Sequence, residues 1–242
     1  MKQILLFGIG LLSIISVNGQ QLLYTSEFGG DKSNGAIMSY DPATDELSTM
    51  ASLGGNPHYG YDILIQENVG TPVQLNGGLT LGNDGYYYGV NEHGSAIFNT
   101  FVSDIVYNNQ SRGMFYRISP ATMKTEVLHA FTGSGEFVFE EFTSSAAYNM
   151  DLGYPVFKVL EVSDGVFYGI AASGGSYNKG GIWKFDINTM AYSKIGEFSD
   201  DASGVGYNPL CPLIKGDGNN LYGVLRNKGA ANIGYIYRVD TY

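Results

Sequence analysis

The chain has 242 residues, with 23 acidic and 13 basic side chains and a formal net charge of −10 at pH 7. Such an acidic surface repels phosphate backbones, so we expect no nucleic-acid partner. The single cysteine, Cys211, excludes an intramolecular disulfide and is expected to be a small buried residue.

The first 19 residues have the pattern of a secretory signal peptide. Lys2 precedes an apolar run over residues 4–17, and small residues at the end of the segment offer a cleavage site before Gln20 or Gln21. The run is too short to span a bilayer comfortably, so we expect no membrane insertion after cleavage. We therefore predict a secreted or cell-surface protein. Its mature part, residues 20–242, has 12 basic and 23 acidic residues and a net charge of −11.

The mature chain is predicted to be all-β. Short apolar-aromatic runs alternate with glycine-bearing turns, and no long stretch has the 3.6-residue period of a helix. The 34 glycines accompany 14% aromatic residues, which disordered glycine-rich chains lack. A phrase beginning LYTSEFGGDKSNGAIMSYD at Leu23 returns in related form from Tyr87, Phe167 and Leu221. Repetition at this spacing indicates a repeat architecture.

Each repeat contains up to four strands, which we name a, b, c and d in chain order. The units lie near residues 22–71, 72–154, 155–208 and 209–242. In the third unit we predict strand a at 155–162 and strands b, c and d from Val166, Ile182 and Tyr192. Strand a recurs from Pro72 and, as PLCPLIKG, from Pro209. Four antiparallel strands repeated in tandem are typical of a β-propeller, one repeat for each blade.

The first unit has no predicted strand a, and the last has no predicted strand d. Closing a propeller ring needs both strands. We therefore predict either an open propeller-like arc or a sequence truncated at its C-terminus. The predicted fold is an all-β propeller or arc of about four four-stranded antiparallel blades, the first and last incomplete.

The long loops are predicted to lie on one edge of the blades. In a four-stranded meander the a–b and c–d turns share one edge, and the b–c and d–a loops share the other. Every a–b and c–d turn is short, whereas the long segments 54–71, 91–112 and 133–154 are b–c or d–a loops. Binding residues concentrate on variable loops held by a rigid scaffold. We expect this loop edge to be the working face.

The repeat resembles a known family. The stretches DGVFYGIAASGGSYNKGGIWKF and LYGVLRNKGAANIGYIYRV are similar to the GloVer tandem repeats of secreted bacterial surface proteins, and more distantly to kelch blades. The resemblance is best over residues 153–240, and the first unit departs from it because no glycine follows Tyr24. The resemblance implies export and a propeller-like fold but no established activity and no catalytic residues. Family members carry a C-terminal anchoring or sorting domain, and none is recognisable here.

The candidate ligand-binding residues are aromatic, acidic and histidine side chains of the loop edge. They are Tyr59, Tyr61, His93, Glu136, Phe139, Glu140, Glu141, Tyr148, Asp151, Tyr177 and Tyr207. Aromatic rings can stack on sugars while carboxylates bind hydroxyls, so a glycan or a cell-surface protein is the expected partner. Two loop carboxylates can instead serve a polysaccharide hydrolase or lyase. The remaining alternatives are an insertion that only packs its aromatics on the blades, and a structural spacer for an anchor domain.

No metal or cofactor is expected. Asp84, Asp164 and Asp217 each precede a glycine and are favoured as turn residues over calcium ligands. His58, His93 and His129 have no metal-ligand spacing, although the first two lie in loops of one edge. The repeat glycines are followed by strands, not by the helix that a phosphate-binding loop needs. We expect Gly169 and Gly223 to permit close strand packing, with Trp183 in the core between blades.

Overall fold

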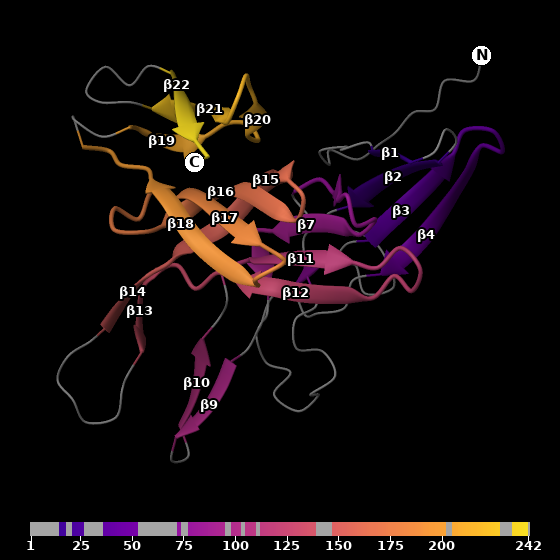
Figure 1. The fold of residues 1–242 in the computed structure, drawn as a ribbon. Coiled ribbons are helices and arrows are strands. Elements are labelled where there is room, and N and C mark those ends of the chain that lie inside the picture. The colour runs from indigo at the N-terminus through magenta and orange to yellow at the C-terminus, as the bar shows by residue number, and fades with distance from the viewer. Residues whose placement is uncertain are drawn as a thin grey trace.

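Most of the residues that the computed structural model describes are in β-strands. The described residues are 15–17, 21–26, 36–52, 72–73, 77–94, 98–102, 105–109, 112–138, 147–201, 205–227 and 234–241. None of them is helical, and this part of the chain therefore holds no helix that could cross a membrane. Four antiparallel sheets follow one another along the chain (Figure 1), and the predicted all-β, propeller-type fold is confirmed.

Sheets one and three each contain four consecutive strands. Sheet one has β1 (Ile15–Val17), β2 (Gln21–Ser26), β3 (Ala36–Asp41) and β4 (Glu46–Ser52). Sheet three has β15 (Leu152–Ser163), β16 (Val166–Gly174), β17 (Gly181–Asp186) and β18 (Ala191–Glu197), which match the four predicted strands of the third unit. In sheet one, β1 takes the place of strand a. It lies inside the segment predicted to be a signal peptide.

Sheets two and four have an interrupted strand a. Sheet two has β6 (Thr80–Leu81), β7 (Tyr87–Asn91), β11 (Met114–Ile118) and β12 (Thr125–Ala130), beside the short pair β5 (Pro72–Val73) and β8 (His93–Gly94). Sheet four has β19 (Tyr207–Pro209), β20 (Ile214–Lys215), β21 (Asn220–Asn227) and β22 (Tyr235–Asp240). Both β19 and β20 pair with the same edge of β21. The continuous strand predicted from Pro209 is wrong, because Pro212 has no N–H for a ladder.

Two hairpins extend from the loop regions. The long segment 91–112 contains the hairpin of β9 (Phe98–Val102) and β10 (Ile105–Asn109). The loop after sheet two forms β13 (Ser134–Val138) and β14 (Ala147–Met150). In Figure 1 both hairpins project away from the stacked sheets. Cys211, expected to be buried, is only half-buried.

Each repeat sheet has two different faces. The tyrosine face carries the repeat tyrosines Tyr88, Tyr168 and Tyr222. The glycine face carries Gly89, Gly169 and Gly223, each directly opposite an aromatic residue of strand c, namely Tyr116, Trp183 and Tyr237. A Cβ on any of these glycines would overlap the ring of its partner, so the expected close packing is confirmed.

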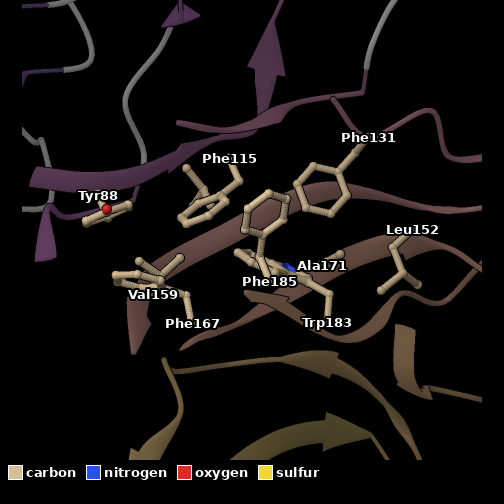
Figure 2. Packing of buried hydrophobic residues seen from close by; sticks show 10 residues of the cluster. Tyr88, Phe115, Phe131, Leu152, Val159, Phe167, Ala171, Trp183 and Phe185 are labelled. Atoms are coloured by element: carbon tan, nitrogen blue, oxygen red, sulfur yellow. The ribbon is translucent and has the colours of Figure 1, made fainter. Parts of the chain in front are cut away.

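The cores lie between successive sheets. The tyrosine face of sheet two packs on the glycine face of sheet three, and Figure 2 shows the cluster between them, with Tyr88, Phe115, Phe167, Trp183 and Phe185. The tyrosine face of sheet three packs in the same way on the glycine face of sheet four. These contacts bury Trp183 completely, as expected for the core between blades.

Sheet one packs with the other face. Its buried Leu23 and Ile37 occupy glycine-face positions, yet they contact Tyr87, Met114 and Tyr116 on the glycine face of sheet two. Sheets one and two therefore pack glycine face against glycine face, whereas the later sheets pack tyrosine face against glycine face. In this sheet Thr25 replaces the repeat glycine and Ile37 replaces the strand-c ring.

In the part of the chain that the structure describes, the short turns and the long loops lie on opposite edges, as predicted, whereas the segment 54–71 lies outside the described residues. On the turn edge, Ile187 donates its backbone N–H to Gly165, 2.9 Å away, so the c–d turn contacts the a–b turn. On the loop edge, Gly175 donates to Asp151 at 2.8 Å and Phe198 donates to Gly180 at 2.9 Å. The b–c loop of sheet three thus contacts the d–a segments on both sides.

Candidate binding surface on the loop edge

The predicted site residues are placed to different extents. Tyr59, Tyr61, Phe139, Glu140 and Glu141 lie outside the described residues. His93, Glu136 and Tyr148 lie in β8, β13 and β14, where only the backbone is described. The described side chains are those of Asp151, Tyr177 and Tyr207. All three are on the loop edge, at the two junctions that flank sheet three.

Asp151 joins sheet two to sheet three. Its Oδ2 accepts hydrogen bonds from the Thr132 backbone at 3.0 Å and the Thr132 hydroxyl at 3.3 Å. Its Oδ1 accepts from its neighbour Leu152 N at 2.7 Å and from Tyr192 Oη, on β18, at 2.8 Å. Both carboxylate oxygens are therefore engaged by donors from two sheets.

An aromatic stack covers this carboxylate. The His129 ring lies parallel to the Tyr192 ring, with centroids 3.7 Å apart, and edge-on to Phe131 at 4.7 Å. His129 Nε2 is 3.6 Å from Asp151 Oδ2. Neither His129 nor Tyr192 was predicted as a site residue, because each is an isolated polar position in a strand d and no spacing links them to Asp151.

The bonds to Asp151 outweigh its burial. Burial alone raises the pKa of the carboxyl, but the neighbouring His129 and the Thr132 and Tyr192 donors hold the pKa below its usual value of 3.8. Burial and the neighbouring Asp151 charge raise the pKa of the Tyr192 hydroxyl. Asp151 is thus a charged acceptor and Tyr192 a neutral donor, an arrangement that holds two sheets together.

Tyr207 forms part of a more accessible group between sheets three and four. The Lys179 ammonium lies 5.0 Å from the centroid of the Tyr207 ring and 2.9 Å from Asp200 Oδ2. Asp200 raises the pKa of Lys179, and Lys179 lowers the pKa of Asp200. Both groups are charged at neutral pH, and the Asp200 side chain is 48% exposed. Donors and acceptors thus stand beside an aromatic ring.

Tyr177 is in the same b–c loop as Lys179, with 47% of its surface exposed. Its neighbour Ser176 donates its backbone N–H to Glu197 Oε1 at 3.0 Å, and Lys194 pairs with the same carboxylate. Burial would raise the pKa of Glu197, but Lys194 and Ser176 lower it. These bonds tie the b–c loop to strand d. We call Tyr177, Lys179, Asp200 and Tyr207 the Tyr207 surface.

A further aromatic–cation pair lies on the loop edge between sheets two and three. The Arg112 guanidinium is 5.7 Å from the centroid of the Tyr154 ring. Gly133 and Gly153 lie close beside the Arg112 side chain, where added Cβ atoms would crowd it. These residues were not singled out in the sequence, because Arg112 and Tyr154 end long loops whose internal contacts leave no periodic signal.

Among the residues that the structure describes, no group of three His, Cys, Asp or Glu side chains can hold a metal ion.

No protein-family model and no curated protein matches the chain. Among solved structures, TolB from Acinetobacter baumannii matches with a TM-score of 0.48 and 13% identity, over 95% of this chain and 41% of TolB. An ulvan lyase bound to -[GlcA(1-4)Rha3S]- has a TM-score of 0.46 and 15% identity, over 87% and 43% of the two chains. The tricorn protease has a TM-score of 0.45 and 14% identity, over 98% and 18%. The chain spans less than half of each of these proteins, and the similarity concerns the fold alone.

Proposed function

We propose that the chain is an exported binding module of β-propeller type that recognises a glycan at the cell surface through its loop edge. The observation that carries the proposal is the Tyr207 surface. There Tyr207 lies beside a charged lysine that pairs with an aspartate, and the exposed Tyr177 lies in the same b–c loop as that lysine. A ring presents a flat apolar surface to the C–H face of a sugar. Lys179 and Asp200 supply a donor and an acceptor for its hydroxyls.

Partial exposure supports a role in binding. The strand-b and strand-c rings of the cores are completely or almost completely buried, as Tyr88, Trp183 and Tyr168 are, and cannot meet a ligand. Tyr177 is half-exposed, and the Lys179 and Asp200 side chains are 32% and 48% exposed. The Asp151 cluster does not offer the same opportunity, because both of its carboxylate oxygens already accept bonds within the fold.

The test is a glycan-array screen followed by titration of the best ligand, with hydrolysis and elimination products monitored. We expect Tyr207→Ala and Tyr177→Ala each to weaken binding about tenfold, equivalent to about 1.4 kcal/mol. Tyr86→Ala is the matched control, because Tyr86 also lies under a cation, with Arg117 4.8 Å from its ring centroid, but sits on the turn edge. We expect this control to bind normally.

Three outcomes would contradict the proposal. Loss of binding in the turn-edge variant alone would place the site on the other edge. Turnover of a polysaccharide would identify a hydrolase or lyase. Absence of binding to every glycan would leave a protein ligand or a structural spacer as the function.

A further inference from the structure

The tyrosine face of sheet four follows the pattern of the tyrosine faces of sheets two and three, in which a strand-b tyrosine lies among mostly apolar residues. Four positions correspond in register, one each from strands a and c and two from strand b. They are Thr80, Tyr88, Val90 and Phe115 in sheet two, Leu160, Tyr168, Ile170 and Ile182 in sheet three, and Ile214, Tyr222, Val224 and Ile236 in sheet four. The faces of sheets three and four each carry three aliphatic residues around the tyrosine, and the face of sheet two carries one.

Burial at these positions differs sharply between the sheets. Phe115 and Ile182 are 0% and 5% exposed, because the next sheet covers them. At the same position Ile236 is 69% exposed, and Ile214 beside it is 62% exposed. Tyr222 and Val224 are partly exposed, whereas their counterparts in sheets two and three are buried. No described sheet covers this face.

We infer that the tyrosine face of sheet four is a docking surface for a further sheet of the same repeat, which presents its glycine face. The two interfaces among sheets two, three and four define this partner. In both, a tyrosine face packs against a glycine face. On that glycine face a strand-c ring covers the strand-b glycine, and an apolar strand-b residue lies on each side of the glycine. A face of the same composition fits the same kind of partner.

A second copy of this chain does not fit as well. The glycine faces of sheets two, three and four are already packed within each copy. Pairing two tyrosine faces of sheet four would bring together the exposed Arg226 and Arg238 of both copies, since these side chains share that face with one carboxylate, Asp240. The excess of positive charge at such a contact opposes association. The inferred partner is therefore a repeat sheet from outside residues 1–242.

The repeat register suggests a direct test. Asp186 and Asp240 occupy the same position after strand c, so a copy of residues 187–240 joined after Asp240 continues the repeat. The copy supplies an outer strand to sheet four and then strands a, b and c of a new sheet. Cys211 is replaced by alanine both in the original sequence and in the added copy. Ile236→Cys in the original sheet four then reports on the burial of this position through its rate of maleimide labelling.

We expect labelling to be rapid in the 242-residue chain and at least about tenfold slower in the extended chain. The matched control carries Leu221→Asp and Leu225→Asp only in the added copy, which keeps the outer strand but spoils the new glycine face. Labelling should then return to the rapid rate. A second extension made from residues 120–186, which presents the Phe167 and Trp183 face, protects against a failure of the first to fold.

Several results would overturn the inference. One is rapid labelling of Ile236→Cys in both extended chains while circular dichroism shows that their added sheets are folded. Another is the failure of both extensions to fold. A third is slow labelling in the 242-residue chain together with a dimer in sedimentation experiments, which would make a second copy the occupant.

Discussion

At the strand-b glycines of sheets two, three and four, the ring of a strand-c residue occupies the space that a side chain at the glycine position would need. Gly169 lies under Trp183, and an added Cβ would overlap the indole. We expect Gly169→Ala to destabilise the protein by about 1–3 kcal/mol, because the packed core can accommodate the added methyl group only if the indole ring or the strand moves. Urea unfolding followed by tryptophan fluorescence measures the loss.

Gly196→Ala is the matched control for this substitution. Gly196 lies in β18, and a Cβ there meets no other atom within 4 Å. We expect its stability to change by less than about 0.5 kcal/mol. Equal losses at both glycines would mean that backbone freedom, not the ring above Gly169, decides the residue at this position.

The Asp151 carboxylate makes the junction of sheets two and three sensitive to acid. Its pKa is lowered in the folded protein from the usual 3.8. Its contribution to stability is therefore fully present well above pH 3.8 and is lost as the pH falls through the lower folded value. We expect Asp151→Asn to destabilise the protein at pH 6 by about 1–3 kcal/mol, since an amide cannot accept all four bonds.

The difference between the Asp151→Asn variant and the unmodified protein should shrink as the pH falls below 3.8. Unfolding free energies from urea titrations at pH 6 and pH 3 measure this. The same substitution at the exposed Asp201 is the control and should show little effect at either pH. A difference between variant and parent that stays constant with pH would assign the loss to packing and not to the charge.

At the scale of elements, the same turn joins strands c and d in sheets one, two and three. Its fifth residue has a positive φ in each, 57° at Asp45, 54° at Met123 and 55° at Met190. This conformation costs a residue with a Cβ roughly 1 kcal/mol. Met190 is 53% exposed, so its side chain contributes little burial.

We expect Met190→Gly to stabilise the protein by about 0.5 kcal/mol, because relief of the strained φ exceeds the entropy that glycine loses on folding. Thermal unfolding by circular dichroism measures the gain. Thr189→Gly, one residue earlier and without a positive φ, should instead destabilise the protein. A loss at both positions would show that the turn is not strained.

The sequence predicted individual elements better than it predicted their contacts. Strands b, c and d were predictable because glycine-bearing turns bound short aromatic runs. The orientation of sheet one was not, since the repeat pattern carries no sign of which face Leu23 and Ile37 present. The surroundings of Asp151 were equally hidden, because Thr132 and Tyr192 reach it from two different sheets and no residue spacing connects them.

At the scale of the whole molecule, sheets two, three and four form a regular stack, and sheet one is attached through a different contact. The order of faces is constant from sheet two onward. Among the described side chains, the cluster between sheets one and two contains seven buried residues, of which Leu23 and Ile37 come from sheet one, whereas the cluster between sheets two and three contains ten. The regular stack is thus the more extensively packed part of the described fold.

The different attachment of sheet one bears on the predicted export of the chain. Strand β1 pairs with β2, through Ile15 opposite Leu23 and Val17 opposite Gln21, but it lies within the segment that the sequence predicts is cleaved. Cleavage before Gln20 or Gln21 would remove β1 and leave β2, β3 and β4, together with Leu23 and Ile37.

We therefore expect the exported protein to begin at Gln20 or Gln21, as determined by intact mass. Its stability should remain within about 1 kcal/mol of the uncleaved chain, because an edge strand paired over three residues adds little to a sheet. An exported protein that retains Met1 would contradict the signal-peptide prediction. A cleaved protein that lost the sheet-two core, seen as rapid amide exchange in β7 and β11, would show that β1 is a structural strand of the fold.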